Sequence, residues 1–423
     1  MLAATTTPSL SAIGLAVAIT VTAGVLLPLN ALIFLFAMLL PIWSIGPLDP
    51  LMFDAARAAV AMLVLVKSKP TSRPLWARDS WAVAVPLSVV GTITLTVGLA
   101  RPDLDAAVTG GTMLLSVFVA WVVLARVANP WTLLNGYLIG LMLSAAVMFL
   151  TAAGFSALTP QENAGYFRLT GLSPSATLIT YQMALGCVIA WAAMRRGTFR
   201  VWYVTVLVAS LVAVVLSGGR GGVAALGIAL IVSIRWGWFR PAPAIVLGLV
   251  GWLVTSQASA IGISINTLER FKSAATGDQP DGRLTLFYDS LQSIVLNPAL
   301  GQGLPEFESM YGGGPHSAIL SFAVAGGLLC GLLILWVTVL LARRLVFTSP
   351  KPFAEAGKAG HLILAVLITD LIFEPTGPFV GVEFVTMLLL AVSLTSTSRW
   401  DGPAAAAPSA ELTSSRSPSS GPV

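Results

Sequence analysis

The sequence predicts an all-α, polytopic membrane protein with about 12 transmembrane helices. The composition, the length of the apolar runs and the positions of the basic residues lead to this fold class. Of the 423 residues, 56% are hydrophobic and only 10% are charged, and the mean hydropathy is +0.88. A soluble domain carries roughly 25% charged residues. This chain therefore has too few charges to cover a surface that faces water.

The apolar runs have the length that a membrane-crossing helix needs, about 20 residues. They are continuously apolar, whereas the strands of a membrane barrel alternate apolar and polar residues, so helices are expected. Pro28 and Pro375 interrupt two of the runs and leave the count at about eleven to thirteen spans. The expected spans are residues 10–28, 31–46, 51–67, 80–99, 104–125, 131–152, 174–194, 200–217, 220–235, 241–258, 316–342, 359–374 and 377–396.

Most basic residues lie in short loops that fall on one side of the membrane if the spans are as given. Cytoplasmic loops are enriched in Lys and Arg, so we expect this side to be cytoplasmic and the net charge of +5 to reflect topology. The residues concerned are Lys67, Lys69, Arg73, Arg78, Arg195, Arg196, Arg200, Arg235, Arg240, Arg343, Arg344, Lys351 and Lys358.

The chain is expected to form a single membrane domain over residues 1–396. Residues 397–423 are rich in Ala, Pro and Ser, which predicts a disordered cytoplasmic tail. The first fifty residues carry one charge, Asp49, and lack the basic region of a cleavable signal peptide, so the first apolar run is expected to stay in the membrane. The side of the N-terminus depends on the helix count and stays open.

Two loops on the predicted external side are longer than a turn, at about 153–173 and 259–315. Loops of the second length are usually functional or disordered. The second loop contains Leu284, Phe287, Leu291 and Ile294 at helical spacing. We therefore expect this loop to carry an amphipathic helix on or near the membrane surface.

Four arginines fall on this external side, against the usual charge bias: Arg168, Arg220, Arg270 and Arg283. An arginine at mid-membrane costs at least about 2.5–3.5 kcal/mol, and less toward the interface. A phosphate-bearing ligand would offset that cost, because guanidinium groups pair with phosphate in a bidentate way.

Arg220 is flanked by glycines over residues 217–222, and their N–H groups could approach an anion closely. The alternative is that this turn simply links two helices while Arg220 extends to the interface. Arg270 is the most ordinary of the four, because Glu269 can pair with it.

His316 follows Gly312–Pro315 and opens a long apolar run on the external side. A neutral imidazole there can accept a proton from a substrate hydroxyl. The helix N-terminus disfavours the protonated form, which suits a general base. The alternative is a structural histidine at a helix start. The other histidine, His361, lies near a cytoplasmic helix end and is expected to be structural.

Carboxylates offer a rival base. We expect most of them to lie on a solvated loop face, although an acid inside the membrane is costly and therefore often functional. No cluster of Cys and His is present, so no metal site is expected. The acids are Asp278, Asp281, Asp289, Glu306 and Glu308 in the long loop, and Asp370, Glu374 and Glu383 in or between the last spans.

These segments resemble the O-antigen ligase and Wzy-polymerase (Wzy_C) superfamily of membrane glycosyltransferases. Arg283–Phe287 followed by Asn297–Gly303 is similar to its R-x-x-x-W and P-x-x-G-x-G elements. His316–Leu320 followed by Gly327–Leu329 is similar to its H-N-x-x-L and G-L-L-G elements. Ser217–Gly221 looks like its S-R-G turn.

A weaker fourth likeness covers Arg168–Pro174, which resembles the family's R-x-x-G-x-x-x-N segment. Two positions depart from the pattern. Ser317 stands where the family has Asn, and Ala325 stands where an acid is common. These departures leave the partners of His316 and the acceptor open.

The resemblance implies a GT-C-like fold and a metal-independent, inverting glycan transfer without a cofactor. The donor would be an undecaprenyl-pyrophosphate-linked glycan at the external face of the bacterial cytoplasmic membrane, and the acceptor a saccharide, lipid or protein. In this family His316 would be the catalytic base, and Arg220, Arg283 and Arg168 would bind the pyrophosphate.

Two alternatives stay open at this point. Within the family, a polymerase joins repeat units whereas a ligase moves a finished polymer, and the sequence does not separate them. A transporter or flippase of a lipid-linked saccharide would also need basic residues near a phosphate. It would be expected to show repeated halves, which this sequence lacks.

Overall fold

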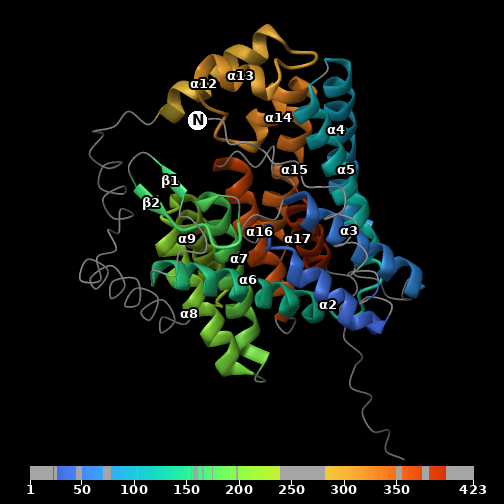
Figure 1. Cartoon of the computed structure of the whole chain (residues 1–423), viewed down its shortest axis with the longest axis vertical. Coiled ribbons are helices and arrows are strands. Elements are labelled where there is room, and N and C mark those ends of the chain that lie inside the picture. Colours follow the sequence, from blue (N-terminus) through green and yellow to red (C-terminus); the bar gives the residue numbers. More distant parts are fainter. Residues whose placement is uncertain are drawn as a thin grey trace, which may run out of the picture.

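The structure is a computed structural model. It describes residue 22 and residues 26–43, 50–69, 78–101, 103–153, 155, 161–163, 166–173, 175–196, 199–238, 282–348, 355–373 and 381–396. These residues form a bundle of helices with one small hairpin (Figure 1). The expected all-α, polytopic fold class is therefore confirmed.

The N-terminal half of the bundle follows the predicted spans closely. Its helices are α2 (Leu29–Leu39), α3 (Pro50–Lys67), α4 (Trp81–Ala100), α5 (Leu104–Leu124), α6 (Pro130–Ala152), α7 (Ala176–Ala193), α8 (Arg200–Ser217) and α9 (Arg220–Arg235). Short 3₁₀ turns, η1 (Arg78–Ser80) and η2 (Met194–Arg196), precede α4 and follow α7. Their agreement with the sequence reflects how strongly a continuous apolar run specifies a helix.

The C-terminal half contains α12 (Gly282–Leu296), α13 (Leu304–Tyr311), α14 (Ala318–Gly326), α15 (Leu328–Phe347), α16 (Glu355–Phe373) and α17 (Val382–Thr395). Among the described residues, seven helices are long and apolar enough to cross a membrane: α4 to α8, α15 and α16. The expected number of about 12 is not confirmed. Four expected features lie outside the described residues: most of the span 10–28, the span 241–258, the loop residues 259–281 with Arg270, and the tail 397–423.

One predicted span is wrong in an informative way. Residues 316–342 do not form one helix, because the chain breaks at Gly327, between α14 and α15. Gly327 has φ 87° and ψ 176°, a conformation that side chains disfavour and glycine permits. The break frees the N–H of Leu328, which donates to the carbonyl of Pro298 at 2.8 Å. An apolar pattern alone does not reveal such a break.

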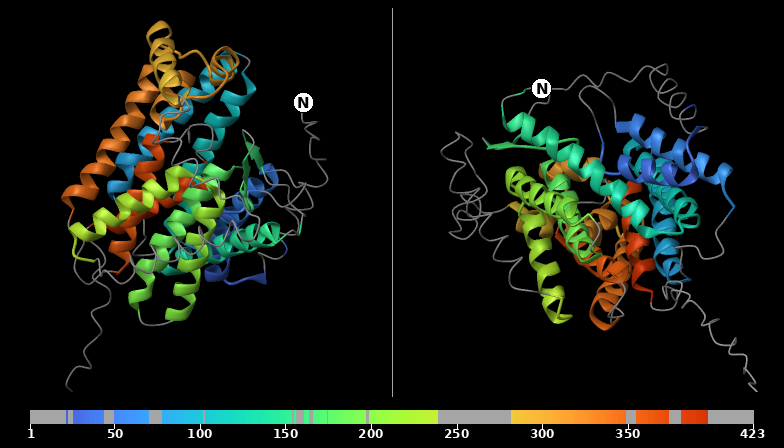
Figure 2. Two further views of the ribbon diagram at one scale, coloured as in Figure 1. Left: turned by 90° about the vertical axis from the view of Figure 1, so that its left-hand side faces the viewer. Right: turned by 90° about the horizontal axis from the view of Figure 1, so that it is seen from below.

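The helices α7 and α16 are mostly buried and form the centre of the bundle, with α17 beside them. In contrast, α4, α8 and α15 keep much of their apolar surface exposed. Such surface is expected on the outside of a membrane bundle, where lipid covers it. The left view of Figure 2 shows α12, in gold, at the upper end of the long orange helix α15.

Several basic loops meet at one end of the bundle, as their sequence positions predict. Arg235, at the end of α9, donates to the carbonyl of Val346 at 3.2 Å. Arg344 forms an ion pair with Asp79 and donates to the carbonyl of Val392 at 3.1 Å. These bonds bring together the ends of α9, α15 and α17 and the start of α4.

His361 lies at this end and is structural, as expected. Its two ring nitrogens lie 2.9 Å from the carbonyl oxygen of Gly357 and 2.8 Å from that of Thr348. The edges of Trp236 and Trp238 pack around the buried imidazole. His361 thus fastens α16 to the segment that follows α15.

The loop predicted at 153–173 contains the hairpin, formed by β1 (Gln161–Asn163) and β2 (Tyr166–Arg168) in antiparallel pairing. The segment after β2 is anchored to the bundle. The N–H of Leu172 donates to the Ser144 hydroxyl at 2.9 Å, and its carbonyl accepts from the N–H of Trp43 at 2.8 Å. This anchoring fixes the entry of the chain into α7.

Candidate active site

His316 lies in a tight turn between α13 and α14. The α13 helix ends at Gly312, which has φ 74°, and α14 begins two residues after His316. Below the turn, the buried hydroxyl of Ser321 donates to the carbonyl of Pro315 at 3.3 Å. The imidazole is half-buried. The glycine- and proline-rich sequence thus forms the turn that its composition predicts, with His316 at the helix entrance.

The turn belongs to a compact unit, which we call the junction unit and define as α12, α13, α14, the start of α15 and the intervening loops. A small apolar core joins its helices, made of Ile294, Phe307, Leu320, Ala323 and Val324. The predicted helix is therefore confirmed as α12. Of its four predicted apolar residues, only Ile294 packs in this core, whereas Leu284, Phe287 and Leu291 are exposed. Its face toward the body contains Ile294 and the buried Ser290 and Ser293.

The loop 297–303 fastens the junction unit to the break between α14 and α15. The N–H of Gly303 donates to the carbonyl of Val324 at 3.0 Å. A Cβ at Gly301 would lie 2.2 Å from the same carbonyl oxygen, and a Cβ at Gly327 would lie 2.4 Å from the carbonyl oxygen of Ala299. Only glycine allows this close approach of two backbones. The P-x-x-G-x-G and G-L-L-G elements therefore meet in space.

Arg283 is the second residue of α12, so its backbone belongs to the same unit as His316. The helices α12 and α14 pack directly against one another. Arg168 is the last residue of β2, opposite Gln161. The side chains of Arg283 and Arg168 lie outside the described part of the chain.

Arg220 is the first residue of α9, directly after the glycine-rich turn that ends α8. The turn packs tightly on α7: a Cβ at Gly219 would lie 2.1 Å from the Thr180 hydroxyl, and one at Gly221 would lie 2.4 Å from the Tyr181 hydroxyl. The hydroxyls of Thr180 and Ser217 are hydrogen-bonded at 2.6 Å. The glycines thus allow the turn to pack closely against α7.

The Arg220 side chain is half-buried at the positive end of the α9 macrodipole. Among the described helices, α9 packs mainly against α7 and α16, whereas α14 packs against α12, α15, α16 and α4. The two candidate regions therefore share α16 as a neighbour, but α9 does not pack extensively on α12 or α14. The structure unites His316 with the helix of Arg283 and leaves Arg220 in a second region.

One family of known proteins matches part of the chain. The Wzy_C model, described as O-antigen ligase, matches residues 205–336. This region is similar to an O-antigen ligase (Wzy_C) domain. It extends from α8 to α15 and contains Arg220, Arg283 and His316, whereas Arg168 lies before it. No curated protein matches the chain.

The Wzy_C match supports an O-antigen ligase/polymerase-like glycosyltransferase family for this protein. The structure adds that three of the resembling segments, those that begin at residues 283, 297 and 316, fold into the junction unit. The turn at 217–221 packs on α7 instead. The glycines of these motifs therefore have a role in backbone packing, in addition to any catalytic role of the motifs.

Asp103 is a residue near the junction unit that the sequence argument did not consider. Its carboxylate caps α5 by accepting from the N–H of Ala106 at 3.1 Å. Its other oxygen faces Gly303, 3.6 Å from where a Cβ would lie. The Asp103 carboxylate therefore lies beside the loop 297–303, which packs on the break at Gly327.

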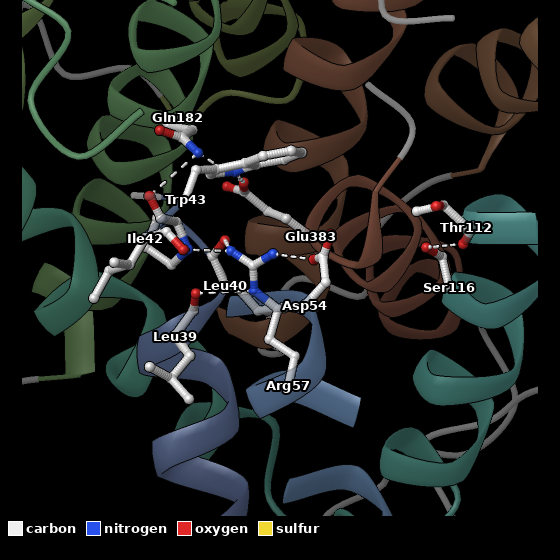
Figure 3. A network of polar contacts seen from close by, with 11 residues as sticks. Leu39, Leu40, Ile42, Trp43, Asp54, Arg57, Thr112, Ser116, Gln182 and Glu383 are labelled. Carbon is white, nitrogen blue, oxygen red and sulfur yellow. Dashed lines mark hydrogen bonds and ion pairs between the residues drawn. The ribbon is translucent and has the colours of Figure 1, made fainter. Parts of the chain in front are cut away.

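A buried carboxylate outside the Wzy_C region was also misjudged from sequence. Glu383, at the start of α17, accepts hydrogen bonds from three side chains: Trp43 at 3.0 Å, Gln182 at 2.7 Å and Tyr137 at 2.7 Å. Figure 3 shows the contacts with Trp43 and Gln182. We call these four residues the Glu383 network.

The expectation of a solvated face holds for Glu306 and Glu308, which are exposed, but is wrong for Glu383 and Asp370, which are buried. The physical reason is that tertiary donors compensate the burial of the Glu383 carboxylate. The sequence signal was the single acid within the otherwise apolar run Val382–Thr395.

Arg57 supports the Glu383 network from α3. Its fully buried guanidinium donates to the carbonyls of Leu39 at 3.1 Å and Leu40 at 3.0 Å, and also to that of Ile42 (Figure 3). The last carbonyls of a helix lack intrahelical partners, so Arg57 satisfies the end of α2. The guanidinium also lies 5.4 Å from the ring centroid of Trp43. This arrangement fixes the Trp43 side chain toward Glu383.

The Glu383 network and the Arg220 turn meet on α7. Thr180 and Tyr181 contact the glycine-rich turn, and Gln182, the next residue, donates to Glu383. One short stretch of α7 thus lies between the Glu383 carboxylate and the glycine-rich turn before Arg220.

Proposed function

We propose that the protein transfers or polymerises a glycan from an undecaprenyl-pyrophosphate-linked donor at the external face of the bacterial cytoplasmic membrane. The Wzy_C match carries this proposal. The junction unit supports it, because the segments that begin at residues 283, 297 and 316 lie in one packed body with His316 at its turn.

In the proposed reaction, the acceptor hydroxyl attacks the anomeric carbon from the side opposite the pyrophosphate. The new glycosidic bond forms as the bond to the pyrophosphate oxygen breaks, which inverts the configuration. The hydroxyl proton passes to His316, whose contribution as a general base is typically about 10²–10⁴-fold. Free undecaprenyl pyrophosphate leaves with the electron pair, and no metal takes part.

Arg220, Arg283 and Arg168 are proposed to bind the pyrophosphate and to stabilise the charge that develops as it leaves. For Arg220, the support is its position at the start of a helix, where the macrodipole favours an anion. For Arg283, it is the packing of α12 on α14. For Arg168, the support is the likeness of residues 168–174 to the family's R-x-x-G-x-x-x-N segment.

The proposal predicts that His316→Ala lowers glycan transfer by about 10²–10⁴-fold in membranes matched for expression. Arg220→Ala should also lower transfer strongly. Arg200→Ala is the matched control, because Arg200 is exposed at the opposite end of α8 from the Arg220 turn. Product is measured with a lipid-linked oligosaccharide, and each variant is checked for an unchanged elution profile.

The product pattern separates the two activities within the family. A growing ladder indicates a polymerase, whereas a single transfer to an added acceptor indicates a ligase. Release of free undecaprenyl pyrophosphate accompanies either one and excludes pure transport. Normal transfer by both His316→Ala and Arg220→Ala would contradict the mechanism.

A further inference from the structure

The outward side of α12 is divided lengthwise into an apolar half and a polar half. The apolar half contains Leu284, Leu291 and Val295, which are 65%, 41% and 76% exposed. The equally outward Thr285 and Gln292 form the polar half. At 3.6 residues per turn, residues 284, 291 and 295 fall on one stripe and residues 285 and 292 on the adjacent one. The side toward the protein holds Ser290, Ser293 and Ile294 instead.

The apolar half is extended by aromatic and aliphatic side chains. Phe287 and Tyr288 are exposed beside it, with their ring centroids 6.1 Å apart. The division ends at the last residue of α12, because the exposed Leu296 falls on the stripe of Thr285 and Gln292. In the loop that follows, Leu300 is exposed as well. A soluble surface rarely leaves so many large apolar side chains together in water. Some apolar environment therefore covers this stripe in the working protein.

The loop after α12 leads to the exposed face of α15. The carbonyl of Pro298 accepts from the N–H of Leu328, which sets this loop beside the start of α15. From there the exposed face of α15 descends through Leu328, Leu332 and Trp336. The helix α15 is long and apolar enough to span a membrane, and only about a third of its residues are buried. Figure 2 shows α12 at the upper end of this helix.

We propose that the apolar half of α12 is immersed in the hydrocarbon edge of the bilayer, while the polar half faces water. The occupant is membrane lipid, because the loop after α12 leads to the face of α15 that lipid must cover. The aromatic pair suits the boundary, since amphipathic rings favour that depth. The inference concerns how the junction unit sits on the membrane and does not depend on the proposed chemistry.

Site-directed spin labelling tests this division of the outward side. Single cysteines replace Leu284, Leu291 and Val295 in one set and Thr285 and Gln292 in the matched set. All five positions are exposed, so the labels do not enter the core. The native Cys187 and Cys330 are buried, and their residual labelling is measured on the parent protein. The full chain is reconstituted in phosphatidylglycerol–phosphatidylcholine bilayers.

We expect the ratio of accessibility to oxygen over accessibility to a nickel chelate to be severalfold higher at 284, 291 and 295 than at 285 and 292. Equal and high nickel accessibility in both sets would place the stripe in water and overturn the inference. Low accessibility to both reagents would place protein over it, and spin–spin broadening would identify a second copy. Either result would also overturn the inference.

Discussion

The junction unit and the Glu383 network both join helices, but by different bonds. In the junction unit, backbone carbonyls and N–H groups of the loop 297–303 meet the break at Gly327 directly. In the Glu383 network, one carboxylate at the start of α17 gathers three side chains, from the segment after α2, from α6 and from α7. The junction unit therefore depends on glycines, which have no side chain to separate the two backbones. The Glu383 network depends on one carboxylate side chain.

The two regions also differ in the range of sequence that they connect. The junction unit lies within one continuous segment of the Wzy_C match. The bonds to Glu383 span 340 residues from Trp43, 246 from Tyr137 and 201 from Gln182. The comparison teaches that the family domain contains its own local architecture, while α17 holds the earlier helices around it. Substitutions should therefore act locally in one region and globally in the other.

The largest loss of stability is expected for Glu383→Leu. This change leaves three buried donors unsatisfied, at a cost of about 1–3 kcal/mol each. The thermal unfolding midpoint in detergent should fall furthest of all variants discussed here, and Glu383→Gln, which keeps one acceptor, should fall less. Glu306→Leu is the control, because its exposed carboxylate on α13 has no comparable role. An unchanged midpoint for Glu383→Leu would contradict the role given to the network.

Sequence reasoning located most helices, the helix α12 and the turn before His316, because each is encoded locally. Apolar runs specify α4 to α9, and the glycines and proline before His316 specify its turn. Two features escaped it. The break at Gly327 interrupts an apolar pattern without changing it, so only the docking of Pro298 and Ala299 reveals it. The donors to Glu383 come from distant helices, and no pattern in one sequence states that they converge.

A smaller and local effect is expected for Gly327→Ala. A Cβ there would lie 2.4 Å from the carbonyl oxygen of Ala299, and the positive φ adds strain of about 1–3 kcal/mol. Hydrogen exchange should rise in peptides covering 297–303 and the start of α15, with little change in α6 or α17. Gly227→Ala is the matched control, because its Cβ would meet nothing within 4 Å on α9. Uniform loss of protection in all helices would show that the junction is not a local unit.

The smallest effect is expected for Ser293→Ala. Its comparison with Ser290→Ala tests a hydrogen bond between two segments against a hydrogen bond within one helix. Ser293, on α12, donates to the side-chain oxygen of Gln302 at 2.6 Å, whereas the hydroxyl of Ser290 donates to the carbonyl of Leu286 in its own helix. Both serines are buried on the same face. Ser293→Ala should cost about 1 kcal/mol, the usual net value of one hydrogen bond, and increase exchange in the docking loop.

Ser290→Ala should leave that loop protected, because Leu286 keeps its intrahelical partner and alanine favours the helix. The comparison of the two variants removes the effect of deleting a hydroxyl from the same buried face. If both raise exchange in residues 297–303 equally, the loop is held by the backbone bonds at Gly303 and Leu328 alone. In that case the side chain of Gln302 would not help to hold the loop 297–303 near the turn that contains His316.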